Sequence, residues 1–259
     1  MLEALMRKLL PPFAALGALV ITAMSAQAFE TAQGVTATPI TKVPFVISAP
    51  GNYYLPGDLE CSTPGVAILV NADEVVLDLN GRSLIAKGAE ASPNVGIGIA
   101  VLNHEDVTIQ NGDINGFGAY AILLDASDGK REHNQKNDVR RVNFNNDQIG
   151  VLTISGSINE IEFCNFDGDA VGVYDIGTLG GDRFQSDNFE NMAPREAMPL
   201  GVGIVSSPGK GTLAEDCLFA DCVTAGIYDS GAQDKLRFNS FVSCVTNFIG
   251  GKSLGALDD

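Results

Sequence analysis

The chain lacks Trp and contains few His, Cys and basic residues. In 259 residues there are two His, five Cys and 16 Lys and Arg, against 32 Asp and Glu. The resulting net charge of −16 opposes binding to nucleic acid and to anionic membrane surfaces. It also opposes binding to an acidic polymer unless a cation bridges the two. The acidity itself is typical of a protein that remains soluble outside the cytoplasm.

The cysteines argue against a metal-binding cluster. No pair has CxxC spacing, which disfavours a zinc site, and an odd number leaves at least one thiol unpaired within the chain. Cys222 and Cys244 stand 22 residues apart in matching Cys-Val-Thr runs and are expected to stack. Straight stacking separates their Cβ atoms by about 4.8 Å, which is long for a disulfide, so we expect buried thiols.

One apolar run, Leu9–Ala23, begins the chain, and no later segment is apolar enough to span a membrane. At 15 residues the run is short of the roughly 20 that cross a bilayer, which disfavours a membrane anchor. Arg7 and Lys8 precede it, and Ala26-Gln27-Ala28 follows with a small-x-small pattern. We therefore predict that residues 1–28 are a cleaved signal peptide and that the mature protein is secreted or periplasmic.

A pair made of a small residue and an aliphatic residue recurs along the chain, separated by 22–23 residues or by 29–31. The short gap is the bare repeat, and the longer gaps contain an inserted loop. A second series alternates with the pairs, and each of its members follows one pair. The pairs are Ala67-Ile68, Gly98-Ile99, Ala121-Ile122, Gly150-Val151, Gly172-Val173, Gly203-Ile204 and Gly226-Ile227. The second series is Leu84, Ile114, Phe144, Phe166, Phe189, Phe219 and Phe241.

Short alternating segments such as Val107-Thr108-Ile109 lie between the two series and indicate strands with one buried face. A unit of this length cannot bury its own apolar face, but stacked units can. The sequence thus predicts an all-β fold, a parallel β-helix of about seven coils with an internal Phe stack. Leucine-rich repeats and propellers fit less well, because helical stretches are absent and a blade needs around 40 residues. We expect a cap and entry strand over 29–64, the β-helix over 65–247 and a tail over 248–259.

The run Val75–Gly81, followed by coils such as Gly98-Ile99 and Gly226-Ile227, resembles the right-handed β-helix proteins of the pectate-lyase-like superfamily. The segment Gly51–Leu55 resembles their entry strand, and the resemblance covers roughly residues 40–250. It implies a single-stranded right-handed parallel β-helix. It says little about function, because the fold carries lyases, hydrolases, epimerases and non-enzymatic adhesins.

Members of this superfamily that cleave polysaccharides work along an outer face of the helix, and their hydrolases need a His motif. His104 and His133 lie in polar loops without the Gly-His-Gly setting of those hydrolases, so we interpret both as solvated loop residues. Uronan lyases instead hold Ca²⁺ with carboxylates beside an Arg or Lys base. If the protein is catalytic, the resemblance therefore favours a lyase over a hydrolase.

A cluster of acids and arginines is the candidate site for such chemistry. Asp167, Asp169 and Asp175 offer hard oxygen ligands for Ca²⁺, and Arg183 and Arg141 are candidate catalytic bases. The alternative is that Asp-Gly-Asp forms only a turn. Asp175 also falls on the inward strand phase, which weakens it as a ligand.

The residue after each inward aliphatic should point outward, which gives a row of apolar and aromatic side chains. The row is Leu69, Ala100, Leu123, Leu152, Tyr174, Val205 and Tyr228. Such a row is unusual on a soluble face. Either another part of the chain covers it, or a partner binds it, or Tyr174, Tyr228 and Leu152 form a platform for sugar rings.

Two functions remain open from the sequence. The first is an exported β-helix that binds or processes polysaccharide, with Ca²⁺-assisted uronan cleavage as its catalytic form. The second is a non-catalytic structural or interaction protein that contacts a component of the cell envelope.

Overall fold

The computed structural model describes residues 36–250, except 88–95, 128–135, 155–157, 177–180, 196–197, 207–210 and 230–234. The predicted signal peptide lies outside the described residues. Two of the inserted loops that lengthen the repeat span 86–95 and 125–138, and most of their residues, including His133, also lie outside the described part. The described residues form β-strands joined by turns, with no helix among them. The described residues thus contain no helix that is long and apolar enough to cross a membrane.

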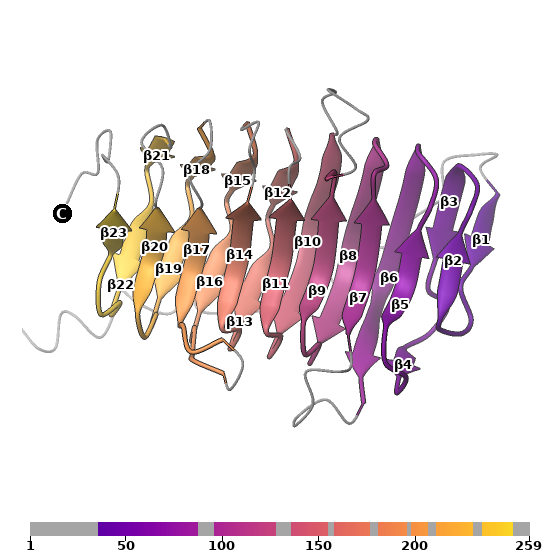
Figure 1. The fold of residues 1–259 in the computed structure, drawn as a ribbon, viewed down its shortest axis with the longest axis horizontal. Helices are drawn as coiled ribbons and strands as arrows, with labels where there is room; N and C mark the ends of the chain where they lie inside the picture. The colour runs from indigo at the N-terminus through magenta and orange to yellow at the C-terminus, as the bar shows by residue number, and fades with distance from the viewer. Residues whose placement is uncertain are drawn as a thin grey trace, which may run out of the picture. The chain divides into compact units, whose positions relative to one another are not determined.

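The strands form two parallel sheets that run along the molecule from the indigo end to the yellow end (Figure 1). Sheet B comprises β2 (Phe45–Ile47), β5 (Val66–Val70), β7 (Ile97–Leu102), β9 (Tyr120–Asp125), β11 (Ile149–Ile154), β14 (Val171–Ile176), β17 (Val202–Ser206), β20 (Ala225–Asp229) and β23 (Phe248–Gly250). Sheet A comprises β1 (Ala37–Pro39), β3 (Gly51–Tyr54), β4 (Leu59–Cys61), β6 (Val75–Ala86), β8 (Val107–Asn115), β10 (Asn137–Asn145), β12 (Glu160–Glu162), β13 (Asn165–Asp167), β15 (Arg183–Gln185), β16 (Asn188–Glu190), β18 (Leu213–Glu215), β19 (Leu218–Ala220), β21 (Lys235–Arg237) and β22 (Ser240–Val242).

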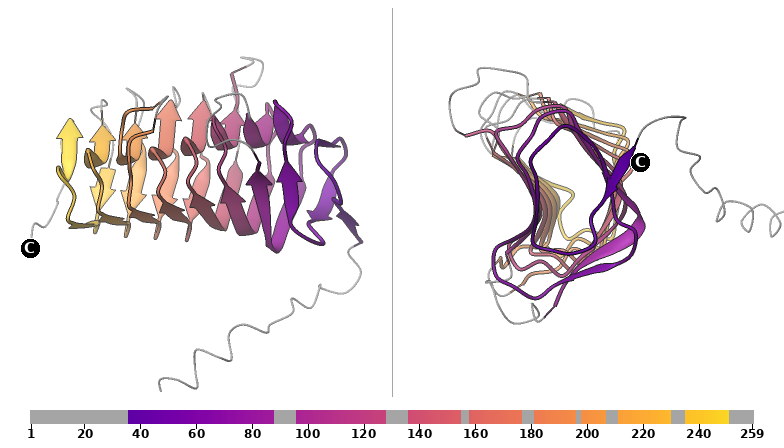
Figure 2. Two further views of the ribbon diagram at one scale, coloured as in Figure 1. Left: turned by 90° about the horizontal axis from the view of Figure 1, so that it is seen from below. Right: turned by 90° about the vertical axis from the view of Figure 1, so that its right-hand side faces the viewer.

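Each coil consists of one strand of sheet B, a turn, and two strand segments of sheet A separated by a bend. Viewed along the stack, successive coils superpose (Figure 2). The predicted parallel β-helix is therefore confirmed. Sheet B has nine strands, so the stack is longer than the seven coils expected. The additional strands lie before residue 65 and after residue 247, in coils that lack the small–aliphatic pair.

Both predicted rows are in register along the stack and point inward. Ile99, Ile122, Val151 and their equivalents pair strand to strand and are buried. Phe144, Phe166, Phe189, Phe219 and Phe241 form a continuous stack, with ring centroids 4.6 to 5.0 Å apart and planes within 13° of parallel. Each buried ring removes apolar area from water and contributes about 1.5–3 kcal/mol.

The small residue of each pair is explained by this stack. A Cβ atom on Gly172 would lie 2.5 Å from a ring carbon of Phe189, and one on Gly203 would lie 2.6 Å from a ring carbon of Phe219. Contacts this short do not occur between carbon atoms in a packed core, so the Phe stack and the glycine positions depend on each other.

Buried Asp side chains connect the turns of neighbouring coils. Oδ1 of Asp147 accepts a hydrogen bond from the backbone N–H of Phe117, and Oδ1 of Asp169 accepts one from that of Asp147, both at 2.6 Å. Asp187 does the same for Cys164 at 2.8 Å, and Asp182 for Asn159 at 2.8 Å. These bonds satisfy backbone donors that have no partner in the coil.

The burial of these acids raises their pKa values. Desolvation is the main cause for all four. The pKa of Asp147 lies well above its usual range because of burial and the nearby Asp169 carboxylate. For Asp182, burial and the charge of Asp175 raise the pKa to about 7.

Candidate functional site

The outward face of sheet A is polar, and its side chains bond from coil to coil. Oδ2 of Asp78 accepts hydrogen bonds from Gln110 at 2.9 Å and from Asn111 at 3.1 Å. Arg140 donates to Gln110 at 2.9 Å, and Asn143 donates to Asp113 at 2.7 Å. The face therefore offers ordered amide, carboxylate and guanidinium groups in parallel rows.

A row of residues with positive φ divides this face, between the two strand segments of each coil. We call it the bend row. The strand registers on both sides align its members from coil to coil. They are Asn111 (φ 59°), Arg141 (53°), Phe163 (55°), Ser186 (56°), Asp216 (56°) and Phe238 (54°). In the preceding coil the register between β6 and β8 shifts between Asp78 and Arg82, and both Asn80 and Gly81 have positive φ there.

Three members of the bend row are unusual for this backbone. Gly, Asn and Asp adopt positive φ at little cost, whereas a bulky side chain there is an outlier that costs roughly 1–3 kcal/mol. Arg141, Phe163 and Phe238 nevertheless occupy the row, and their side chains do not gain burial from it. Phe163 is 54% exposed and Phe238 is 70% exposed.

A second row with positive φ follows the inward Phe stack, and we call it the edge row. It is aligned in the same way and contains only small or polar residues, namely Gly116, Asn146, Gly168, Asn191, Asp221 and Ser243. Arg195 fastens this row, because it donates to the Asn146 side chain at 2.9 Å and to the Gly168 carbonyl at 2.8 Å. The edge row thus shows what the backbone geometry alone selects.

Arg141 and Phe163 lie next to each other in adjacent coils of the bend row. The guanidinium carbon of Arg141 is 6.0 Å from the centroid of the Phe163 ring, which is at the limit of a cation–π contact. Both residues are exposed. An aromatic ring and a cation are thus presented together on a face rich in hydrogen-bonding groups.

The outward face of sheet B is apolar and contains the predicted outward row in register. Leu152, Tyr174, Val205 and Tyr228 align directly from coil to coil. Leu152 and Val205 belong to a second hydrophobic cluster, separate from the core, against which Tyr174, Met198 and Leu200 pack. Leu152 is 3% exposed and Tyr228 is 42% exposed, so the predicted sugar platform is largely closed at its centre.

The predicted metal ligands have separate partners. Asp167 points outward and accepts a hydrogen bond from Asn191 at 2.8 Å. Asp169 is fully buried, and Asp175 lies inside the helix between the hydroxyls of Thr153 (2.9 Å) and Thr212 (2.6 Å). Within the described residues no three His, Cys, Asp or Glu side chains are grouped so as to hold a metal ion.

The two candidate bases both lie on the outward face of sheet A, but in different rows. Arg183 is on β15 and its guanidinium is 3.5 Å from Oε2 of Glu215, whereas Arg141 lies two coils earlier in the bend row. Asp169 and Asp175 point into the helix interior, away from this face. The structure therefore brings Arg141 to an exposed aromatic ring rather than to the predicted carboxylates.

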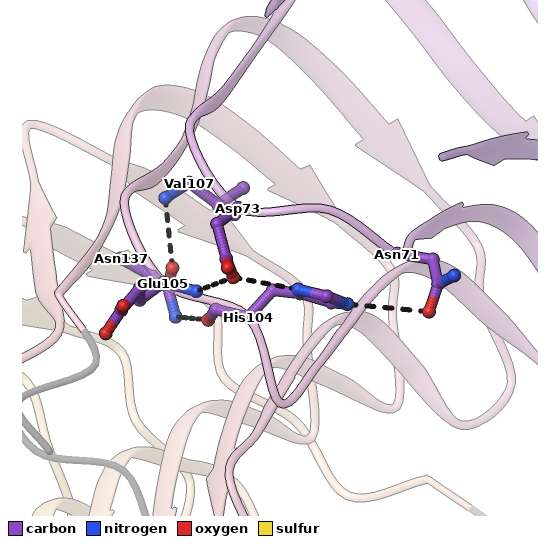
Figure 3. A network of polar contacts seen from close by, with 6 residues as sticks. All are labelled: Asn71, Asp73, His104, Glu105, Val107 and Asn137. Carbon is purple, nitrogen blue, oxygen red and sulfur yellow. Dashed lines mark hydrogen bonds and ion pairs between the residues drawn. The ribbon is translucent and has the colours of Figure 1, made fainter. Parts of the chain in front are cut away.

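The interpretation of His104 as a solvated loop residue is wrong. Its Nδ1 lies 2.8 Å from Oδ1 of Asp73 and its Nε2 lies 3.4 Å from Oδ1 of Asn71, which are both in the preceding coil (Figure 3). The Asp73 oxygen also accepts the Glu105 backbone N–H at 3.0 Å. With 19% of its side chain exposed, His104 joins two turns.

The bend row was missed in the sequence, although a signal for it exists. Each of its members from Asn111 onward stands three residues before a member of the second series, as Phe163 does before Phe166 and Phe238 before Phe241. The offset identifies the row once the series is known. It does not reveal that the backbone there has positive φ.

No protein-family model matches the chain, and no curated protein matches it in sequence. Among solved structures, the chain is similar to the A-module of the mannuronan C-5 epimerase AlgE4 from Azotobacter vinelandii. The TM-score is 0.50 at 10% identity, over 85% of this chain and 81% of that one. At this identity the similarity shows the fold alone, which is the right-handed parallel β-helix.

Proposed function

We propose that this protein binds polysaccharide along the outward face of sheet A, with the polymer following the bend row. The observation that carries the proposal is the presence of exposed Phe163 and Phe238 at backbone positions that disfavour them. Strained residues that persist without gaining burial are typical of functional sites. The edge row, at similar φ values, contains only small or polar residues, and this contrast supports the proposal.

The chemistry of the face suits sugars. Pyranose rings have apolar faces that stack on aromatic rings, and their hydroxyls bond to amides and carboxylates such as those beside the bend row. Phe163 and Phe238 are three coils apart, or about 14 Å at the usual strand spacing. One coil advances by a distance close to one sugar unit of an extended chain, so both rings can contact one oligosaccharide.

The structural neighbour is named for its action on mannuronan, which is a polysaccharide, and this agrees with the proposal at a coarse level. An exported location, as residues 1–28 predict, would bring the protein to such polymers. The proposal is one of binding, because the candidate bases and acids are not gathered at one place.

A second candidate function rests on the apolar face of sheet B. Its aligned side chains form a hydrophobic cluster on the outside of the helix, where a soluble protein usually carries polar residues. A component of the cell envelope that packs on this face would make the protein an anchored, non-catalytic one. Tyr228, which is in register with Val205 of the neighbouring strand, is 42% exposed on this face.

The test is a binding measurement with Asn substitutions in the bend row. We expect wild-type protein to bind at least one member of a panel of neutral and acidic polysaccharides, and the double variant Phe163→Asn and Phe238→Asn to lose at least about tenfold in affinity. Tyr228→Asn on sheet B is the matched control and should bind normally. Unchanged binding by the double variant, or loss with the control alone, would place the site elsewhere.

A further inference from the structure

Cys222 and Cys244 lie one above the other in neighbouring coils at the end of the stack. All five cysteines of the chain are free thiols in this structure. We propose that Cys222 and Cys244 form a disulfide when a small disulfide oxidant, such as oxidised glutathione, reaches them, and that the bond links the last described coil to the one before it. The inference is independent of polysaccharide binding.

Backbone hydrogen bonds align the two cysteines. The Asp221 N–H donates to the Val242 carbonyl at 2.9 Å. The Val245 N–H donates to the Cys222 carbonyl at 3.0 Å. The strands that precede the two cysteines, β19 and β22, are paired in register. Cys222 and Cys244 therefore occupy the same position in successive coils. Their Cα atoms are one strand spacing apart, about 4.8 Å, which is within the range of about 4.4–6.8 Å that a disulfide spans.

The other three cysteines have no such neighbour. Cys164 and Cys217 share a register position but lie two coils apart, with Asp187 between them. Their thiols donate to carbonyls of earlier strands, at 3.6 Å and 3.7 Å. Cys61 is on β4, near the opposite end of the stack. Among the five cysteines, all of which the structure describes, Cys222 and Cys244 are thus the pair in adjacent coils.

The end of the stack allows the small movement that the bond requires. The Cβ atoms of a disulfide lie about 3.5–4.5 Å apart, against about 4.8 Å in straight stacking. In the interior of the stack, strands on both sides hold each coil in place. In the last described coil, β21 and β22 pair on one side only among the described strands, with β18 and β19. The coil of Cys244 can therefore move toward Cys222.

The two thiols differ in exposure, which sets the order in which they react. Cys222 is fully buried. Cys244 is half-buried and belongs to the last coil, whose inward Leu236 and Phe241 are also only partly buried. Burial raises the pKa of the Cys222 thiol, and the adjacent Cys244 thiol raises it further. Cys244 therefore reacts with the oxidant first, and Cys222 completes the bond.

The reaction with oxidised glutathione is a thiol–disulfide exchange in two steps. The Cys244 sulfur loses its proton and attacks one sulfur of the glutathione disulfide, whose S–S bond breaks and releases one glutathione thiolate. The Cys222 sulfur then loses its proton, attacks the Cys244 sulfur and displaces the second glutathione thiolate. The two protons pass to the two thiolates. Two protein thiols are thus oxidised to one disulfide, and one glutathione disulfide is reduced to two thiols.

The bond should stabilise the end of the stack. It joins residues 22 positions apart and restricts the unfolded chain. We expect oxidation to raise the melting temperature by about 5–10 °C. The linked coil also contains Phe238, so the bond holds one end of the bend row in place.

The experiment treats the folded full chain with oxidised glutathione and maps the disulfide by mass spectrometry. A protease that cleaves before Asp places Cys217 in 216–220, Cys222 in 221–228 and Cys244 in 234–257, so each possible link gives a different pair of peptides. We expect 221–228 linked to 234–257, a loss of two of the five thiols and the rise in melting temperature. A reductant should reverse all three.

Cys244→Ala and Cys217→Ala are the matched variants. Cys217→Ala should keep the link, and Cys244→Ala should lose it together with the rise in melting temperature. Five free thiols in wild-type protein after treatment, or a glutathione adduct on Cys244 that is not displaced, would overturn the proposal. A link between two molecules, seen as a dimer on a non-reducing gel, would overturn it as well. The wild-type map decides the outcome even if a variant does not fold.

Discussion

The bend row and the edge row solve the same backbone problem with different residues. From the coil of β8 onward both rows hold φ between 53° and 77°, and the members of each row are aligned from coil to coil. The edge row uses Gly, Asn, Asp and Ser, whereas the bend row contains Arg141, Phe163 and Phe238. Since the geometry is shared, the backbone conformation does not explain the bulky residues of the bend row, and this difference supports the proposal that the outward face of sheet A binds a ligand.

Both rows are held by the same core, and the largest effect is expected from a substitution in that core. Phe189 lies between Ser186 of the bend row and Asn191 of the edge row, and it is fully buried in the Phe stack. Phe189→Ala should lower the free energy of unfolding by about 3–5 kcal/mol, because it leaves a cavity between two rings. Chemical denaturation measures this, with Phe238→Ala as the exposed control. An unchanged midpoint for Phe189→Ala would contradict the stacking register.

The sequence predicts the packing of the core better than any other part of the molecule. The spacing of Phe166, Phe189 and Phe219 shows which side chains stack, because a solenoid repeats one environment at a fixed interval. The number of coils was less accessible. The strands β2 and β23, at the two ends of the stack, lack the small–aliphatic pair that marks the repeat in the sequence.

The candidate site was harder to predict, because it depends on backbone conformation and side-chain direction. Asp167 and Asp169 are two residues apart and suggested a common ligand set. The left-handed Gly168 between them turns one outward and the other into the core. His104 was misassigned because its partner Asp73 is 31 residues away, in the previous coil. Contacts between coils follow from the register and not from local sequence.

The residue after a row member is in several coils a buried Asp, and these acids make the stability of the fold depend on pH. After the edge row, Asp147 and Asp169 are buried in adjacent coils, and after the bend row Asp187 is buried between Cys164 and Cys217. Their pKa values are raised by burial, so the folded state holds more protons than the unfolded state. Stability is therefore full below the ordinary Asp pKa and is lost as pH rises through the raised pKa.

We expect Asp147→Asn to increase the free energy of unfolding at pH 8 by about 1–3 kcal/mol, and to change it little at pH 4. The amide keeps an oxygen that accepts the Phe117 N–H and cannot ionise, so it removes the cost of burying an acid that is ionised in the unfolded chain at pH 8. Asp187→Asn should gain less, because no second fully buried acid adjoins it. Denaturation curves at both pH values measure this. An Asp147→Asn variant that is less stable than wild type at pH 8 would contradict the raised pKa of Asp147.

Exchanging residue types between the two rows should give the smallest change in stability, and it tests the comparison of the rows directly. Asn191→Phe puts an aromatic residue into the edge row and removes the bond to Asp167, so it should lower the melting temperature by a few degrees, equivalent to about 1–2 kcal/mol. Phe163→Asn relieves the same backbone and should raise the melting temperature by a similar or smaller amount. Differential scanning calorimetry gives both values. A loss of stability with Phe163→Asn would mean that the ring serves the fold.

The most direct test of the account is to locate a bound oligosaccharide on the protein by backbone amide chemical shifts. The account predicts shifts that gather along the bend row, at Arg141, Phe163, Ser186, Asp216 and Phe238, with the edge row and sheet B unaffected. Shifts centred on Leu152, Tyr174 and Tyr228, or along the edge row, would contradict it.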